Sequence, residues 1–128
     1  MGEGEVTRVA VRAVRGATKL SADDPVEMTG AVVELLEQML ERNELTLADL
    51  ISVIFTATPD LNSEFPAAAA RTVGLGDVPL LCAQEIDVAG ALPRVVRVML
   101  HAESARSRAE IVHIYLRGAE VLRKDLAQ

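Results

Sequence analysis

The first part of the chain alternates between apolar and polar residues with the two-residue period of a β-strand. Residues 8–15 divide into two sets of side chains that point to opposite sides of the backbone. The more apolar set begins at Val9 and ends at Arg15. Gly16-Ala17-Thr18 follows, and we expect this small-residue segment to end the strand.

A longer segment has the period of an amphipathic helix. Asp24 is a favourable N-cap, Pro25 suits the first helical position, and Glu27 adds a carboxylate at capping-box spacing. The acids after this turn lie largely opposite an apolar stripe, and we expect the helix to end near Asn43. The stripe consists of Val32, Leu35, Leu36, Met39 and Leu40.

Residues 50–57 form a nearly continuous apolar run before a Thr-Pro-Asp turn, which predicts a strand buried on both faces. One helical turn at residues 46–49 is expected before it, and an alanine-rich helix at 66–73, ending near Gly74, after it. Apolar runs predict further strands at 78–83, 95–101 and 111–116, with residues 120–122 as a candidate extension of the last.

These elements predict a single α/β (α+β) domain over residues 1–128, with a mixed sheet of about five strands. The terminal residues 1–7 and 124–128 are expected to be flexible. One long helix and a few short helical turns cover only part of one face of such a sheet. The economical cover for the other face is another copy of the chain.

Composition narrows the class of protein. The net charge is −6, with two Phe and one Tyr, so neither a basic face nor a base-stacking platform for nucleic acid is expected. No apolar run approaches the roughly 20 residues that span a bilayer, and the N-terminal residues do not resemble a secretory signal. Cys82 is the only cysteine, which excludes an intramolecular disulfide. A cytoplasmic location is the prediction.

The charges are unevenly distributed. Residues 23–64 contain ten acids and one base, and the rest of the chain contains nine acids and twelve bases. We therefore expect any anionic ligand to bind outside the acidic segment. A solvated acidic helix face explains the same distribution without a ligand.

Arg97 is the most informative residue because it interrupts the apolar run 95–100. An unpaired guanidinium in a dry strand costs several kcal/mol. It therefore either pairs with a buried acid, for which Glu85 is the candidate, or lines a cavity that receives an anion or an electron-rich ligand. Glu85 and Arg97 at neighbouring strand ends could also hold two parts of one polar ligand.

Other residues have both a structural and a functional interpretation. Arg15 is either a surface arginine or a second anion ligand, and Tyr115 is either a core tyrosine or a site residue. Cys82 fits an inert core thiol. His101 and His113 lack metal-ligand spacing, and the chain has no phosphate loop, dinucleotide fingerprint or nucleophile elbow. Arginines in apolar strands instead predict a site that binds an anion and acts by electrostatics and positioning.

Segments in four regions of the chain, taken in order, resemble the monofunctional trimeric chorismate mutases. They are residues 14–18; 56–61 with 65–71; 82–88 with 97; and 113–116 with 122–123. The resemblance spans most of the chain. It departs from the family pattern at Ala68, where a basic residue is expected, and at Lys124, where a proline is expected.

The resemblance implies a trimeric pseudo-barrel with an active site in each cleft between subunits. It implies the Claisen rearrangement of chorismate to prephenate in aromatic amino-acid biosynthesis, without a cofactor or metal. Arg97 would place its guanidinium on the ether oxygen of the breaking bond, and Glu85 would accept a hydrogen bond from the ring hydroxyl, with Cys82 close by. Arg15 and Tyr115 would bind a substrate carboxylate.

The remaining roles concern the walls of the site. The resemblance implies that Phe65 and Arg71 come from the adjacent subunit, and that Arg123 and the C-terminal tail close over the ligand. Two rival functions are a trimeric enamine/imine deaminase, which binds a carboxylate with an interface arginine, and a non-catalytic ligand-binding trimer.

Overall fold

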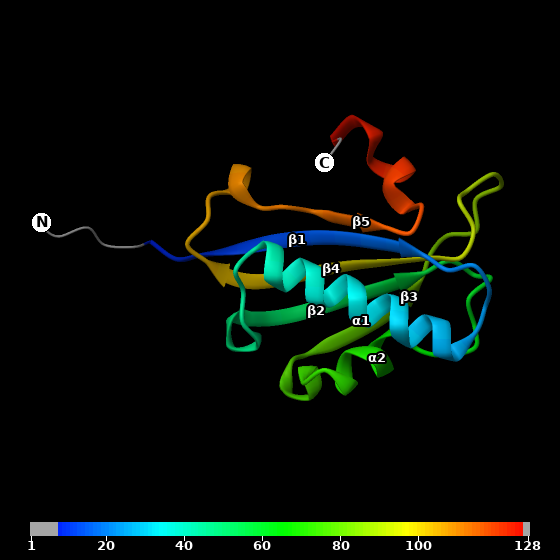
Figure 1. Ribbon diagram of the computed structural model, residues 1–128, viewed down its shortest axis with the longest axis horizontal. Helices are drawn as coiled ribbons and strands as arrows, with labels where there is room; N and C mark the ends of the chain where they lie inside the picture. Colours follow the sequence, from blue (N-terminus) through cyan, green and yellow to red (C-terminus); the bar gives the residue numbers. More distant parts are fainter. Residues whose placement is uncertain (1–7, 127–128) are drawn as a thin grey trace, which may run out of the picture.

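Five strands form one mixed sheet, and both α-helices pack on the same face of it (Figure 1). The computed structural model describes residues 8–126, without the side chains of 124–126. Residues 1–7 and 127–128, part of the predicted flexible ends, lie outside the described residues. The strands and α-helices are β1 (Ala10–Lys19), α1 (Pro25–Arg42), β2 (Leu50–Ala57), α2 (Pro66–Thr72), β3 (Leu80–Gln84), β4 (Val95–Ser104) and β5 (Ile114–Leu116). The short 3-10 segments are η1 (Leu47–Asp49), η2 (Leu75–Asp77), η3 (Arg108–Glu110) and η4 (Ala119–Leu126).

The strand order is β3-β2-β4-β1-β5. The central strand β4 is antiparallel to both β2 and β1, while β3 is parallel to β2 and β5 is parallel to β1. The mixed five-stranded sheet of a single α/β domain is thus confirmed.

The helix predictions are largely confirmed. The Asp24 carboxylate accepts a hydrogen bond from the Glu27 backbone N–H (2.8 Å), and Asn43 is the C-cap of α1. The Glu27 carboxylate does not return to the Asp24 backbone. It accepts instead from the Ser21 backbone N–H (2.6 Å) and hydroxyl, which ties the loop before the helix to its first turn. The short helix α2 and the capping box of η1 are also present.

Strand β1 does not end at Gly16, as the sequence suggested, but continues to Lys19. A Cβ at Gly16 would lie 2.6 Å from Met39 Sδ and 3.2 Å from the Ile114 carbonyl oxygen. Helix α1 and strand β5 therefore approach the backbone of β1 more closely than a larger residue allows. The glycine serves close packing inside the strand and not its termination.

Several other strand predictions are corrected. Strand β2 is covered on one face only within the chain, since Val53 and Phe55 are buried while the alternate residues Ile54 and Thr56 line an open cavity. Strand β4 extends to Ser104, and β5 begins only at Ile114. Residues 120–122 belong to η4 and do not extend β5, because Arg117 and Gly118 have positive φ and turn the chain.

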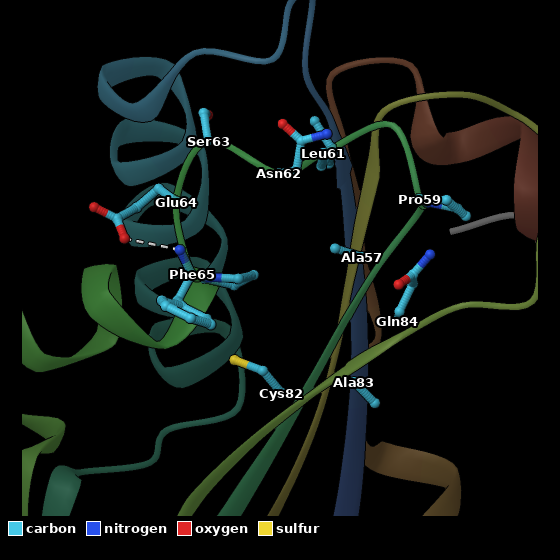
Figure 2. A pocket seen from close by; sticks show the side chains of 11 residues that line it. Ala57, Pro59, Leu61, Asn62, Ser63, Glu64, Phe65, Cys82, Ala83 and Gln84 are labelled. Atoms are coloured by element: carbon cyan, nitrogen blue, oxygen red, sulfur yellow. Dashed lines mark hydrogen bonds between the residues drawn. The ribbon is translucent and has the colours of Figure 1, made fainter.

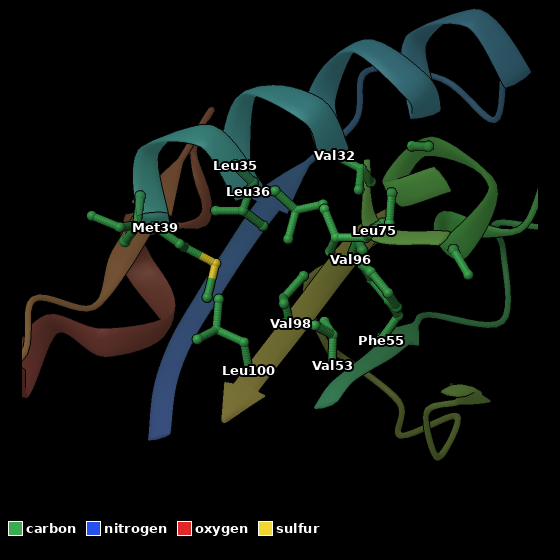
Figure 3. Packing of buried hydrophobic residues seen from close by; sticks show 14 of the residues in the cluster. Val32, Leu35, Leu36, Met39, Val53, Phe55, Leu75, Val96, Val98 and Leu100 are labelled. Carbon is green, nitrogen blue, oxygen red and sulfur yellow. The ribbon is translucent and has the colours of Figure 1, made fainter. Parts of the chain in front are cut away.

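The core lies between α1, α2 and the covered sheet face (Figure 3). The apolar stripe of α1 contributes Val32, Leu35, Leu36 and Met39, all at most 1% exposed. They pack against buried strand residues, among them Val53, Phe55, Val96, Val98 and Leu100. Among the described residues, no helix has the length and apolar character needed to cross a membrane.

Asn43 connects the end of α1 to the segment before β5 through hydrogen bonds. It is 1% exposed, donates to the carbonyl oxygens of Met39 and Val112 (2.8 Å each), and accepts from the Val112 N–H (2.8 Å). Asn43→Ala leaves these buried groups without partners, so we expect the free energy of unfolding to fall by about 3 kcal/mol. Denaturant titration at fixed protein concentration measures this.

Asn62→Ala is the matched control for this prediction, because Asn62 is exposed and only its backbone N–H forms a hydrogen bond, to Asp23. The control is expected to change the free energy of unfolding by less than about 0.5 kcal/mol. Equal effects of the two substitutions would contradict the structural role of Asn43.

Candidate functional site

The sheet face opposite α1 and α2 brings the predicted site residues together through strand register. It is called the uncovered face below, because among the described residues η4 and Leu92 pack on only part of it, at Ala17 and Val95. Arg97 on β4 lies opposite Thr56 on β2 and Ala17 on β1, and Ala17 in turn pairs with Tyr115 on β5. Because paired residues point to the same side of a sheet, Thr56, Arg97 and Tyr115 form one row across it. The row includes two of the residues singled out in the sequence.

A second row lies two residues along each strand. Met99 on β4 pairs with Arg15 on β1 and with Ile54 on β2. Together with Thr56, Arg97, Tyr115 and Arg123, these residues line a cavity of about 370 Å³. This volume is in the range of small-molecule binding sites. The structure therefore places Arg15, Arg97, Tyr115 and Arg123 around one cavity.

Glu85 joins Arg97 to the end of β2. Its backbone N–H donates to the Ala57 carbonyl oxygen (2.9 Å), just beyond the last residue of β3. Its carboxylate accepts a hydrogen bond from the Thr56 hydroxyl (2.6 Å) and lies 3.6 Å from Arg97 Nε. The predicted pairing of Glu85 with Arg97 is thus present. Thr56 fixes the carboxylate independently of the arginine.

Arg97 is not buried within one chain. Its side chain is 50% exposed, whereas that of Glu85 is 18% exposed. The two possibilities from the sequence are therefore compatible, since the guanidinium has a partly buried acidic partner and also lines a cavity. A half-exposed cation is strongly screened by water, so its electrostatic effect on a ligand needs additional cover.

Tyr115 and Arg123 lie at the β5 side of the cavity. Arg123 Nη1 donates to the Tyr115 hydroxyl (3.4 Å), and Arg123 lies at a kink within η4, where its φ and ψ are −131° and 49°. A tyrosine hydroxyl and two arginines, Arg15 and Arg123, are donors suited to a carboxylate. The cavity has a cation on both sides: Arg97, paired with the Glu85 carboxylate, lies at one side, and Arg15 and Arg123 lie with Tyr115 at the other.

Phe65 and Cys82 line a different cavity, of about 400 Å³ (Figure 2). Cys82 pairs in register with the buried Phe55, so its side chain is on the helix-covered face, opposite that of Thr56 and Arg97. Phe65 is 70% exposed where the chain enters α2, and Arg71 is exposed in the last turn of that helix. Within one chain the structure therefore groups Cys82 with Phe65 and not with Glu85.

Sequence reasoning did not identify Thr56 or His113 as site residues. Thr56 is an ordinary strand residue in sequence, and only the register places its hydroxyl beside Glu85. His113 Nδ1 accepts a hydrogen bond from the Arg15 backbone N–H (3.0 Å). Thr56 and His113 lie in the segments 56–61 and 113–116 that carry the family resemblance, which was the signal for both, but no role was assigned to either.

The described residues contain no group of three or more His, Cys, Asp or Glu side chains that could hold a metal ion. The two positions that depart from the family pattern, Ala68 and Lys124, lie on α2 and η4. Ala68 is partly exposed on α2, whose only charged residue is Arg71. Lys124 lies in η4, and its side chain is outside the described part of the chain.

Comparison with known proteins agrees with this geometry. Residues 11–126 match the family model described as chorismate mutase type I. The chain is 46% identical over 117 residues to the chorismate mutase AroH of Thermus thermophilus, covering 91% of this chain and 96% of that protein. It is 38% identical over 118 residues to the chorismate mutase AroH of Bacillus subtilis (strain 168), covering 91% and 93%.

The fold agrees as well. A solved structure of a chorismate mutase from Clostridium thermocellum matches with a TM-score of 0.84 and 44% identity, covering 85% of this chain and 97% of that one. A family match over most of the chain and relatives of this identity and coverage lead to one assignment. The chain belongs to the type I chorismate mutase family.

Proposed function

We propose that this protein is a chorismate mutase, an isomerase that converts chorismate to prephenate in the cytoplasm for aromatic amino-acid biosynthesis. The family membership supports the reaction. The observation that carries the mechanism is the cavity with Arg97, which pairs with Glu85, at one side and Arg15, Tyr115 and Arg123 at the other.

The reaction sets specific demands on such a site. In the Claisen rearrangement one C–O bond breaks and one C–C bond forms within a single molecule. The reaction needs no nucleophile, proton transfer, cofactor or metal. The enzyme accelerates it by holding the enolpyruvyl ether folded over the ring and by stabilising negative charge on the departing ether oxygen. A millionfold acceleration requires about 8 kcal/mol in total.

Arg97 is proposed to donate to the ether oxygen, and Glu85 to accept a hydrogen bond from the ring hydroxyl. The structure explains why both groups can be in place before the substrate binds. The Thr56 hydroxyl donates to the Glu85 carboxylate at 2.6 Å, and this carboxylate forms an ion pair with Arg97 Nε at 3.6 Å. Donors fixed in advance cost no reorganisation during the reaction.

Arg15 and Tyr115 are proposed to bind a substrate carboxylate, and Arg123 to close over it. These side chains come from β1, β5 and η4, so the carboxylate would lie at the side of the cavity away from Glu85. This placement orients the substrate, because its hydroxyl and its carboxylate then bind at opposite sides of the cavity.

The complete site is proposed to form between subunits of a homotrimer. Arg97 is 50% exposed in one chain, and apolar side chains on the uncovered sheet face are exposed beside the cavity, including Leu81 (62%) and Met99 (36%). A neighbouring copy that covers this face removes water from Arg97 and buries the apolar surface. Phe65, Cys82 and Arg71 are proposed to be the groups that this neighbour supplies.

The proposed function is tested by incubating the purified protein with chorismate and measuring prephenate. Saturable formation of prephenate is the expected result. Hydrolysis of an imino acid without prephenate formation would support a deaminase instead. Saturable binding of chorismate without turnover would support a non-catalytic binding protein.

The pH dependence of turnover distinguishes electrostatic catalysis from acid–base catalysis. Since Arg97 stays cationic and no side chain transfers a proton, kcat is expected to vary by less than about twofold between pH 7 and 9. Steady-state assays in buffers of constant ionic strength measure this. A bell-shaped profile in this range would contradict the mechanism.

A further inference from the structure

His113 lies where the pairing between β5 and β1 stops. Strand β5 begins at Ile114, which pairs with Gly16, so β1 continues past the end of its shorter neighbour. The Arg15 N–H lies at this end and donates to His113 Nδ1 at 3.0 Å. The imidazole of His113 therefore accepts the hydrogen bond from the Arg15 N–H at a position where β5 no longer offers a backbone carbonyl.

This hydrogen bond requires one particular form of the imidazole. Nδ1 can accept only when it carries no proton, so the ring is neutral with its proton on Nε2. The surroundings favour that form. Burial first, and then the positive charges of Arg15 and Arg123, hold the pKa of His113 below its ordinary value of 6.5.

Among the described side chains, none that lines the cavity beside His113 is acidic, so none there offsets the positive charges. His113 and Arg15 line a third cavity with Arg12 of β1, His101 of β4 and Arg108 of η3, and no carboxylate is among its lining residues. Helix α1 meets the adjacent residue Val112 through the uncharged Asn43. A proton on His113 thus adds a cation to a cluster of cations.

We propose that His113 is a positioning residue for the active site, and that its neutral imidazole holds the backbone of Arg15 so that the guanidinium lies in the substrate cavity. The inference rests on the proposed function, because Arg15 is assigned there to a substrate carboxylate. His113 does not line the Arg97 cavity itself. It acts through the main chain of Arg15.

Two substitutions separate the acceptor from the bulk of the ring. His113→Asn places an amide oxygen near the position of Nδ1, while His113→Leu fills similar space without an acceptor. In His113→Leu the Arg15 N–H loses its partner. The KM for chorismate is then expected to rise about tenfold, with kcat within about twofold of wild type. His113→Asn is expected to restore the wild-type KM to within about twofold.

Whether the loss appears in KM or in kcat decides whether His113 acts by positioning Arg15. A loss confined to kcat, or equal losses in the two variants, would overturn the proposal. Thermal unfolding and sedimentation of both variants accompany the kinetics. If His113→Leu fails to fold, His113→Asn and the pH profile of the wild-type enzyme carry the test.

The pH profile gives a readout that packing alone does not produce. As the pH falls below 6.5 and through the pKa of His113, Nδ1 gains a proton and can no longer accept from Arg15. The wild-type KM is expected to rise over this range, whereas the KM of His113→Asn rises less. A constant ratio of the two KM values, or a wild-type KM that falls, would overturn the proposal.

Nitrogen NMR of the imidazole without substrate tests the hydrogen bond independently of catalysis. The expected spectrum at pH 7.5 shows an unprotonated Nδ1 and a protonated Nε2, with the Arg15 amide shifted when His113 titrates. The opposite tautomer would overturn the proposal. Failure of chorismate turnover together with the expected spectrum would remove the proposed function and leave the His113–Arg15 contact intact.

Discussion

Arg97→Ala is expected to lower kcat by roughly a thousandfold while the protein keeps its fold and oligomeric state. A single donor aimed at developing negative charge contributes about 3–4 kcal/mol to transition-state stabilisation. Removing it is tolerable for the fold, because Arg97 is 50% exposed and Glu85 keeps its hydrogen bond from Thr56. Chorismate consumption gives kcat, and sedimentation gives the oligomeric state.

Two further variants make this result specific. Arg97→Lys keeps the charge without the planar fork of donors, so we expect it to restore only part of the lost kcat. Arg42→Ala removes an exposed arginine at the end of α1 that does not line the cavity, and is expected to leave kcat within about twofold of wild type. A near-normal kcat in Arg97→Ala would remove the proposed mechanism.

The sequence was sufficient for the features that depend on local pattern. Asp24 and Asn43 delimit α1 as predicted because capping is a property of neighbouring residues. Arg97 was singled out as a candidate because a guanidinium in an apolar strand has few physical explanations, pairing with an acid or lining a cavity. The family resemblance, carried by short segments in order, agrees with the family match over residues 11–126.

Features that depend on non-local packing were not predictable in this way. Gly16 has the local signature of a strand end, and only the approach of Met39 and Ile114 explains a glycine inside β1. The run 50–57 suggested burial on both faces, yet a single chain covers one. The proposed trimer would cover its outward apolar side chains, and periodicity cannot distinguish a strand covered by another subunit from one buried inside a single chain.

The candidate site shows the same difference between features set by local sequence and features set by non-local packing. Arg15, Arg97 and Tyr115 were singled out individually as candidates, but their meeting in one cavity depends on the register of β1, β4 and β5. The placement of Cys82 depends on strand alternation relative to Phe55, which positions it on the opposite face from Arg97. A register shift of one residue would reverse that assignment.

The shared site can be tested by mixing subunits that carry different substitutions. Arg71 lies on α2 on the helix-covered side of the sheet, and Arg97 points from the uncovered side, so they cannot meet within one chain. Arg71 is also the only charged residue of α2. We therefore expect Arg71→Ala alone to lower kcat/KM about a hundredfold, by removing the cation that a neighbour supplies.

Arg97→Ala and Arg71→Ala subunits, unfolded and refolded together at equal concentrations, are expected to regain about one quarter of wild-type activity. In a cyclic trimer each site takes Arg97 from one subunit and Arg71 from the next, and half of the chains supply each intact residue. Prephenate formation after refolding measures the recovery against each variant refolded alone.

The control pair is Arg97→Ala with Arg15→Ala. Arg15 and Arg97 line the same cavity of one chain, so no arrangement of these two variants contains an intact site. This mixture is expected to stay at the level of the separate variants. Recovery in both mixtures, or in neither, would contradict a site in which Arg15 and Arg97 come from one subunit and Arg71 from the next. Recovery of activity in the Arg97→Ala and Arg71→Ala mixture alone would mean that Arg71 of one subunit reaches the cavity of another. Helix α2 of one subunit would then lie against the sheet face that carries Arg97 in its neighbour.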